Sequence, residues 1–417
     1  MRKITRRTAL GTLAAGSFIL GAPAIKRATA QGAPFKIGHI GPMSGAASSM
    51  GQRAQIGVDM AMKKLNAAGG ILGRPVEVLY RDDKASPAEA GLVTRDVMGQ
   101  GAQVILGGWL TAPANGSIPV VESEKGVMIT LGASQPAFTR EQFTRRNFRL
   151  VFDSIMYHYG RAVAAAQKYP NISSWSVIMP DVEFAHIGYK VFVAATKQHY
   201  PGKNITFHEP VLHKFGATDY KVQVAKLYEQ KADALLTMNI DADTIAFFTQ
   251  AQATPLLPTY KAIFENGFGE YMADKLSANL PPNFWSFQTW WAGAKEATNE
   301  AKEFFKEYSA RTGKVDSDNL SASGYTSMMA IANAAKLKKS TDVDAIIDGL
   351  EEIRFESVLG PNFGFRKEDH QGLTPTLNVR FESQSAAPGW KIAEYIRVEA
   401  EKTMGPPTPG KKYEIPA

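Results

Sequence analysis

Short apolar runs alternate along this chain with longer segments in which apolar residues recur every three or four positions. The longer segments predict amphipathic helices: Val58, Ala61, Met62 and Leu65 share one helix face, and further helices are expected over Ala88–Met98 and Ala114–Glu124. The apolar runs predict strands, most of them buried, over Phe35–Ile40, Val76–Tyr80, Val104–Leu106 and Val127–Thr130.

The same rhythm continues in the second half of the chain. Strands are expected at Ser176–Met179, Ala234–Met238 and Lys261–Phe264, and helices at Tyr220–Lys231, Thr244–Ala253, Ala294–Arg311 and Ser323–Lys336. Alternating strands and helices imply parallel sheets covered on both faces. Because 417 residues exceed one hydrophobic core, we expect an α/β fold of two lobes, followed by an extended Pro-rich tail over 404–417.

The first 30 residues have the features of an export signal. They combine a basic start, a mildly apolar stretch over Leu10–Ala24, and the A-x-A sequence Ala28-Thr29-Ala30, after which cleavage is expected. Thr5–Leu10, with its arginine pair, is similar to the twin-arginine signal that exports folded proteins; a Sec signal with a chance arginine pair is the alternative. The expected partner is therefore the twin-arginine or the Sec export machinery.

Most of the net positive charge of the chain lies in its first 30 residues. The chain has 47 Lys and Arg against 40 Asp and Glu, a formal charge of +7, and six of the basic residues lie in the leader. Without the leader, 41 basic residues stand against 40 acidic ones, a net charge of +1. The basic residues are interspersed with acidic ones, so they form no continuous basic stripe that could follow a nucleic-acid backbone. The chain has no cysteine, so disulfides and a cysteine-linked lipid anchor are excluded. These features predict a periplasmic protein without an anchor.

Enzyme motifs are scarce. The sequence lacks G-x-S-x-G, Walker A, H-E-x-x-H and G-x-G-x-x-G patterns, and no nucleophile and base stand at a readable spacing. His208 and His213 are expected in a surface loop, and the neighbours Asp82 and Asp83 to point in opposite directions. We therefore expect no catalysis, metal or cofactor; an exported hydrolase is the alternative from a different class.

Two loops are better suited to binding. Gly107–Pro113 and Gly132–Pro136 each follow a predicted strand and lead toward a helix. Small residues let a ligand approach backbone N–H groups, and the hydroxyls of such loops add donors, an arrangement that suits a carboxylate. In open α/β sheets, ligands bind beyond the carboxyl ends of the strands, where both loops lie.

At this point the chain resembles a family. Phe35–Gly45 (FKIGHIGPMSG), Leu65–Gly73 (LNAAGGILG), Asp82-Asp83, Gly107–Thr111 and Val358–Pro361 (VLGP) resemble the branched-chain amino-acid-type periplasmic binding proteins of ABC importers, over roughly 34–400. The resemblance implies the type I periplasmic binding fold, with two Rossmann-like lobes that have parallel central sheets. It also implies a small-molecule ligand held between the lobes and delivered to an inner-membrane ABC permease.

The same resemblance implies lobe boundaries. The N-terminal lobe is expected over 31–152 and 288–358, and the C-terminal lobe over 153–287 and 359–403. The three crossovers would then fall near Phe152-Asp153, Trp285–Trp290 and Val358–Phe363. A soluble sensor that feeds a signalling receptor has the same architecture and stays open as an alternative function.

Site residues follow from the resemblance position by position. Thr111 falls where the family binds the ligand carboxylate, Gly132 where a backbone N–H donates, and Ser134 where a second hydroxyl stands. The side-chain pocket and the second lobe add a further set: Met50, Ala85, Trp109, Phe184 and Asn239.

One position leaves the ligand open. Asn266 falls where amino-acid binders carry the acid that pairs with the ammonium, and an alignment slip of one residue would put Glu265 there. If Asn266 faces the cleft, the ammonium loses its counter-charge. The ligand is then a carboxylate or amide that lacks this group. The predicted ligand therefore stays open between an amino acid and an aromatic or aliphatic acid or amide. Trp109, Phe184 and Phe268 suit an apolar or aromatic body.

Overall fold

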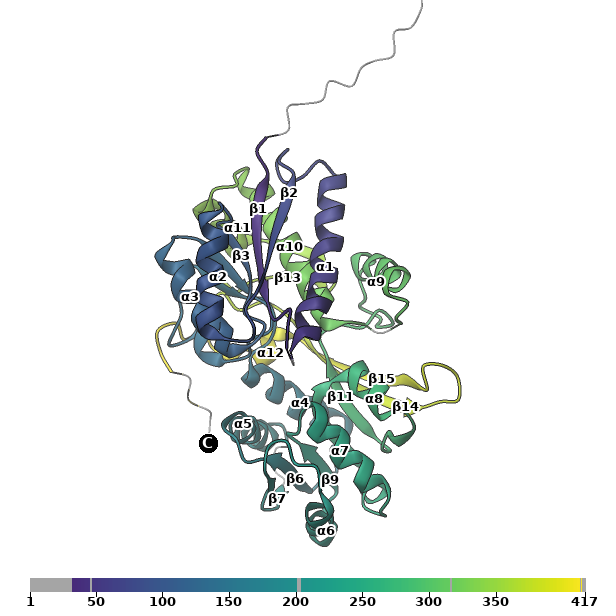
Figure 1. Cartoon of the computed structure of the whole chain (residues 1–417). Coiled ribbons are helices and arrows are strands. Elements are labelled where there is room, and N and C mark those ends of the chain that lie inside the picture. Colours follow the sequence, from purple (N-terminus) through teal and green to yellow (C-terminus); the bar gives the residue numbers. More distant parts are fainter. Residues whose placement is uncertain (1–31, 46, 201–203, 316, 413, 415–417) are drawn as a thin grey trace, which may run out of the picture.

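The computed structural model describes residues 32–412 and 414, apart from 46, 201–203 and 316. The predicted leader and its cleavage site lie outside the described residues, as does the side chain of Phe268. The rest forms two α/β lobes, one above the other in Figure 1, each built on its own sheet. The predicted fold class is confirmed. Among the described residues, no helix is long and apolar enough to cross a membrane.

A five-stranded parallel sheet forms the centre of the first lobe, in the order β2-β1-β3-β4-β5. Its strands are β1 (Phe35–Gly41), β2 (Val76–Asp82), β3 (Val104–Gly107), β4 (Val127–Thr130) and β5 (Asn147–Arg149). The four predicted strands of this region are present. Each is followed by a helix on a face of the sheet, except β4, which leads through a 3-10 turn at Pro136–Thr139 to β5. The carboxyl ends of all five strands therefore lie at one edge.

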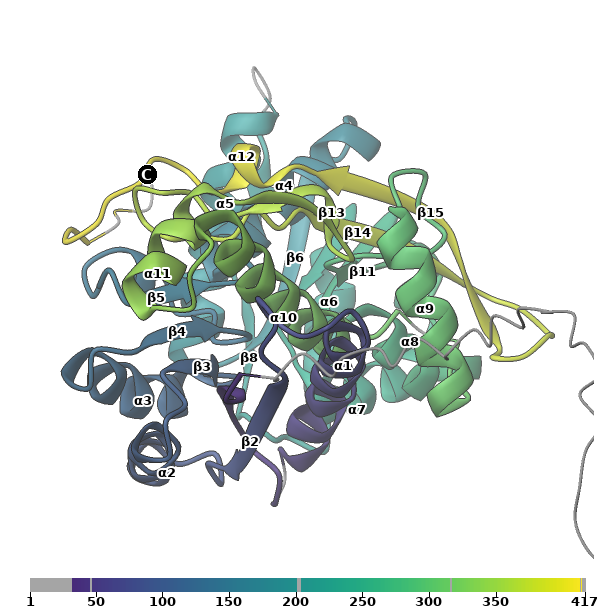
Figure 2. The ribbon, with the colours of Figure 1, turned by 90° about the horizontal axis from the view of Figure 1, so that it is seen from above.

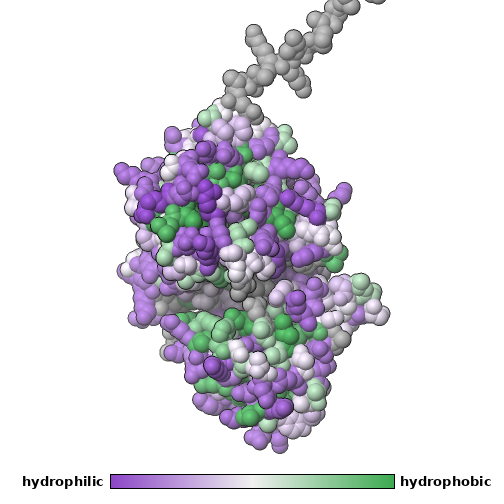
Figure 3. Space-filling view, viewed as in Figure 1, coloured by the Kyte–Doolittle hydropathy of each residue, from purple (hydrophilic) through white to green (hydrophobic). Residues whose placement is uncertain are grey.

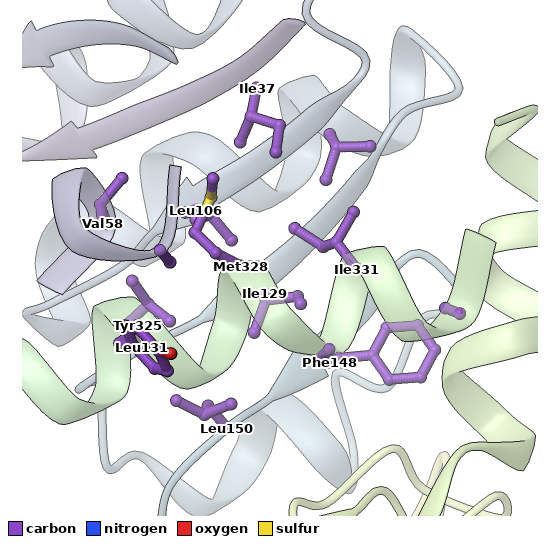
Figure 4. Packing of buried hydrophobic residues seen from close by; sticks show 14 of the residues in the cluster. Ile37, Val58, Leu106, Ile129, Leu131, Phe148, Leu150, Tyr325, Met328 and Ile331 are labelled. Atoms are coloured by element: carbon purple, nitrogen blue, oxygen red, sulfur yellow. The ribbon is translucent and has the colours of Figure 1, made fainter. Parts of the chain in front are cut away.

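Helices cover both faces of this sheet. The first face carries α1 (Ser48–Ala67), α9 (Asn299–Thr312), α10 (Asn319–Lys338) and α11 (Val343–Glu352); the second carries α2 (Pro87–Gly99) and α3 (Thr111–Ser123), as the view from above shows (Figure 2). The strands alternate between them: Leu106 packs with Val58 and Met328 on the first face, while Ile105 packs with Val97 on the second. Figure 4 shows the first of these clusters.

The helix predicted at Ala294–Arg311 begins later than expected. Thr298 is its N-cap, because its hydroxyl accepts a hydrogen bond from the N–H of Ala301, and α9 starts at Asn299. Residues 294–298 form turns instead. The helix packs on the first lobe through Phe304, whose ring lies 5.0 Å from that of Tyr325 on α10.

The second lobe has an eight-stranded sheet that is parallel at its centre. Its order is β15-β14-β11-β10-β9-β6-β7, with β8 also paired to β6, and β14 and β15 run antiparallel to their neighbours. The strands are β6 (Ser174–Pro180), β7 (Thr206–Phe207), β8 (Val211–His213), β9 (Ala234–Thr237), β10 (Ala262–Phe268), β11 (Phe284–Gln288), β14 (Thr376–Ser383) and β15 (Trp390–Val398). The parallel sheets implied by the sequence are present in both lobes.

Helices cover this second sheet on both faces as well. One face packs against α4 (Ser154–Lys168) and α5 (Glu183–His199), and the other against α6 (Lys221–Gln230) and α7 (Asp241–Gln252). The short helices α8 (Gly269–Leu276) and α12 (Ala400–Thr403) follow β10 and β15. His213, expected at the surface, is buried on β8, where its Nε2 lies 2.9 Å from Asn239 Oδ1.

The chain passes between the lobes three times. It leaves the first sheet after β5, returns after β11, and leaves again after the hairpin of β12 (Arg354–Ser357) and β13 (Gly360–Gly364). The third crossover lies later than predicted: Phe363 and Phe365 pack in the first-lobe core, and Gln371 bridges to Arg149 of β5. The lobe boundary at 359 therefore falls inside a first-lobe hairpin.

Polar contacts tie the crossover segments together. Glu270 of α8 accepts from the backbone N–H of Ser317, and Asn319 donates to Gln288 of β11. The residues after Met404, expected as an extended tail, have no helix or strand in their described part and lie against Arg140, which donates to the Met404 carbonyl at 3.1 Å.

Candidate functional site

A cavity of about 410 Å³ lies between the lobes and is lined from both sides. The first lobe contributes the loops after β3 and β4 and the start of α1, and the second contributes α4, α5 and the ends of β10 and β11. In the space-filling view, the surface is hollowed across the waist between the lobes (Figure 3). The volume is of the size that small-molecule sites have.

The first-lobe wall is built around the start of α3. Gly108 takes a positive φ of 64°, which turns the chain sharply after β3 and directs it into the helix at Thr111. The first intrahelical hydrogen bond runs from Ala114 N to Leu110 O, and Pro113 has no N–H. The amides of Thr111 and Ala112 precede that bond, so the positive end of a 13-residue helix lies beside the cavity.

Two hydroxyl groups stand near this helix end. Thr111 and Ser134 both line the cavity, and within the described part of the chain neither side chain has a recorded hydrogen bond. The Ser134 loop is held in place by its carbonyl, which accepts from Ser154 N of α4 at 2.9 Å. Free hydroxyl donors at a helix N-terminus form a suitable site for a carboxylate.

Gly132 supports this wall through its small size. Its N–H lies 3.3 Å from the Gly108 carbonyl, so the donor expected for the ligand already has a long intramolecular partner. A Cβ at this position would come within 2.8 Å of Trp109 O. Trp109 is buried under the loop, and its indole Nε1 has no hydrogen-bond partner among the described residues.

The second-lobe wall is largely aromatic. The rings of Phe152 and Tyr157 each lie 4.5 Å from that of Phe287 in edge-to-face contacts. Burial raises the pKa of Tyr157, so its hydroxyl keeps its proton, and within the described residues that hydroxyl is unpaired. Phe184 closes the outer side and is 40% exposed.

A buried arginine lies directly behind this wall. Arg161 of α4 donates through Nη1 to Asn266 Oδ1 at 3.2 Å, and the same nitrogen lies 3.2 Å from His158 Nδ1. Its Nη2 donates to the carbonyls of Thr237 and Phe264, at 3.2 and 2.8 Å. Burial, reinforced by the Arg161 charge, lowers the pKa of His158 well below its usual value, so the imidazole is neutral.

Most predicted site residues line this one cavity; the three that do not are Asn239, Ala85 and Glu265, the last of which is described below. Those that line it are Met50, Trp109, Thr111, Gly132, Ser134, Phe184 and Asn266. Asn239 is buried against His213, and its neighbour Ile240 takes the place at the cavity. Ala85 lies in the loop after β2, where its N–H donates to Asp83.

The one-residue ambiguity at β10 is resolved geometrically. Asn266 lines the cavity, whereas Glu265 is buried beneath it and its Oε2 accepts from the Ser286 hydroxyl at 2.6 Å.

Sequence reasoning missed the contribution of α4. Tyr157 and His158 line the cavity and Arg161 supports it, as do Phe152 and Phe287 on neighbouring segments. The available signal was a polar cluster, Tyr157-His158-Tyr159 with Arg161, inside an otherwise apolar helix that Asp153 caps. Among the described residues, no group of three or more His, Asp or Glu side chains is placed to hold a metal ion.

Comparison with known proteins agrees with this architecture. A family model described as periplasmic binding protein matches residues 34–386. A leucine-, isoleucine-, valine-, threonine- and alanine-binding protein of Pseudomonas aeruginosa is 29% identical over 121 residues. That match covers 29% of this chain and 31% of the relative, so it spans less than a third of the relative's length.

Two solved structures share the fold over nearly their full length. A branched-chain amino acid transporter substrate binding protein from Streptococcus pneumoniae, in complex with isoleucine, has a TM-score of 0.71 at 21% identity, covering 88% of this chain and 99% of that one. A solute binding protein of an ABC transporter from Rhodopseudomonas palustris BisB5, in complex with 3,4-dihydroxybenzoic acid, has a TM-score of 0.71 at 20% identity, covering 88% and 98%.

Proposed function

The chain belongs to the periplasmic binding protein family, and on that premise we propose that it is the solute-binding component of an ABC importer. It captures a small carboxylate-bearing ligand between its lobes and delivers it to an inner-membrane permease. The observation that carries the proposal is the cavity between the lobes, where the N-terminus of α3 and the hydroxyls of Thr111 and Ser134 face an aromatic wall.

Several further facts support a carrier. The ligands named for the two similar solved proteins, isoleucine and 3,4-dihydroxybenzoic acid, both bear a carboxylate. Both similar solved proteins are named as binding proteins of transporters. Capture without turnover also accounts for a cavity that combines hydroxyls at a helix N-terminus with apolar rings.

The proposed location is the periplasm. The basic leader with Arg6 and Arg7 and the A-x-A sequence at Ala28–Ala30 support export through the twin-arginine route, followed by cleavage after about Ala30. Replacing both arginines with lysine should leave uncleaved precursor inside the cell if this route is used. Export at the parental level by the double variant would favour the Sec route instead.

Binding is tested with the processed chain and a panel of amino acids, 2-oxo acids, aromatic acids and amides. A true ligand at 100 times its dissociation constant should stabilise the protein by about 2.7 kcal/mol, which a thermal-shift assay detects. The matched control is the Thr111→Ala/Ser134→Ala variant, for which the shift should shrink. If no carboxylate or amide shifts the melting curve of the parent protein, the proposal fails.

A further inference from the structure

The buried Arg161 determines which atoms the second-lobe wall presents to a ligand. A guanidinium carries only hydrogen-bond donors, so both groups in contact with its Nη1 must accept: Asn266 through Oδ1 and His158 through Nδ1. The neutral imidazole of His158 therefore carries its proton on Nε2. The amide of Asn266 is left with its Nδ2 hydrogens, whose recorded contact is to the Met238 carbonyl at the long distance of 3.5 Å.

Both residues line the cavity, and Asn266 is thereby fixed as a donor toward it, while the Nε2 of His158 lies against Gly188 of α5. Two neighbouring polar groups do not open into the cavity: the Trp109 indole N–H lies against Gly41 of β1, and the Tyr157 hydroxyl is fully buried. From the first lobe, the hydroxyls of Thr111 and Ser134 line the cavity.

Negatively charged partners for a cation are lacking in the described lining of the cavity. No Asp or Glu is among the described residues that line the cavity. The nearest acid described there, Glu265, lies beneath Gly267, whose missing side chain leaves room for the carboxylate, and it is hydrogen-bonded to Ser286. Its charge acts on Arg161 from within the lobe and offsets that buried cation.

From this distribution of donors we infer that the ligand is a carboxylic acid without an ammonium group, whose second polar group is an acceptor oxygen. A 2-oxo acid with an apolar side chain has this chemistry. The carboxylate would meet the α3 N-terminus, the keto oxygen would accept from Asn266, and the apolar body would lie among the rings of Phe152, Phe184 and Phe287. An ammonium in place of the keto oxygen would face hydrogen-bond donors and the positive charge of Arg161, both of which disfavour it. The inference rests on the proposed function and specifies its substrate class.

Matched ligand pairs test the inference on the unmodified protein. Isothermal titration compares 4-methyl-2-oxopentanoate with leucine, and phenylpyruvate with phenylalanine, since each pair differs only at the group on Cα. We expect the oxo acid to bind at least ~100-fold more tightly in the better pair, because the amino acid leaves buried donors unpaired. Equal or tighter binding of the amino acid would overturn the inference while leaving the proposed function intact. Failure of every carboxylate and amide to bind would instead overturn both.

A variant tests whether Asn266 is responsible. Asn266→Asp supplies acceptor oxygens at the cavity, and we expect the preference for the oxo acid to fall by ~10-fold or more. Asn333→Asp on α10, a partly buried position of the first lobe outside the cavity, is the matched control and should keep the parental preference. An unchanged ratio in a folded Asn266→Asp protein would contradict the assignment of Asn266. If that variant does not fold, the ligand pairs on the parent protein still decide the matter.

Discussion

The hydroxyl groups of Thr111 and Ser134 offer the most direct test of the first-lobe wall, because neither has a recorded intramolecular partner in the described structure. We expect Thr111→Ala and Ser134→Ala each to weaken ligand binding by about 1.5–3 kcal/mol, the usual contribution of a hydrogen bond to a charged group. Titration calorimetry measures the loss, and Thr218→Ala on the exposed surface of the second lobe is the control. Unchanged affinity in both variants would move the carboxylate site elsewhere.

His39 of β1 makes a separate prediction about pH. The ring is buried, with neither nitrogen bonded to a described group, and burial lowers its pKa to about 4. The unfolded ring titrates near its usual pKa of 6.5, so below that pH the unfolded state binds a proton that the folded state refuses. Stability is therefore complete above 6.5 and declines as the pH falls toward 4.

Removing the titrating ring should flatten this decline. Between pH 7 and pH 5 the parent protein should lose about 2 kcal/mol more of its free energy of unfolding than His39→Leu. Urea denaturation at both pH values measures the difference. Between pH 8 and pH 7 the two proteins should run in parallel, which serves as the internal control. Equal losses down to pH 5 would show that His39 does not couple folding to pH.

The strand-end loops depend on close backbone approach, which Gly132 tests. A methyl group at this position would meet the Trp109 backbone at 2.8 Å, so Gly132→Ala must displace the loop or the indole. We expect a loss of about 1–3 kcal/mol in the free energy of unfolding, together with weaker ligand binding. Gly99→Ala, at the end of α2 with nothing within 4 Å, is the matched control and should be neutral or slightly stabilising. Equal stability of both variants would contradict the packing role of Gly132.

Local pattern is enough to predict the elements that position half of the site. The apolar runs at β1, β3 and β4 and the glycine-containing loops after them predict Thr111 and Ser134 at one edge of a parallel sheet, and both line the cavity at that edge. Periodicity contains this information because a buried strand is apolar on both faces and ends where turn residues begin.

The other half depends on partners distant in sequence. Arg161 and His158 stand in a helix of which ten residues are buried. The buried guanidinium is tolerable there because residues distant in sequence, such as Thr237, Phe264 and Asn266, accept its hydrogen bonds. The family resemblance also left two choices at β10, Asn266 and Glu265, because an alignment slip of one residue exchanges them and the sequence does not show which side chain meets the cleft. Ala85 was misplaced because the chain after β2 turns through a positive φ of 56° to bond Asp83.

The arrangement of the two lobes makes ligand binding a property of the whole molecule. The wall with the proposed carboxylate site belongs to the first lobe and the aromatic wall to the second, so a ligand in contact with both would favour the form in which the lobes approach. Three crossovers join the lobes, and segments of this kind act as hinges when two lobes close on a ligand. Small-angle scattering should record a smaller radius of gyration when ligand is added.

A substitution at Phe184 can distinguish an effect on closure around the ligand from an effect on the stability of the fold. It lines the cavity yet is 40% exposed, and its ring lies 6.5 Å from that of Phe215, which is 51% exposed at the same rim. If closure buries Phe184 against the ligand, Phe184→Ala should weaken binding by about 1–3 kcal/mol, while the ligand-free protein loses no more than about 1 kcal/mol of stability. Leu92→Ala on α2, 62% exposed and outside the cavity, should change neither quantity. A Phe184→Ala protein that binds and compacts like the parent would show that the rim stays open to water when the ligand is held.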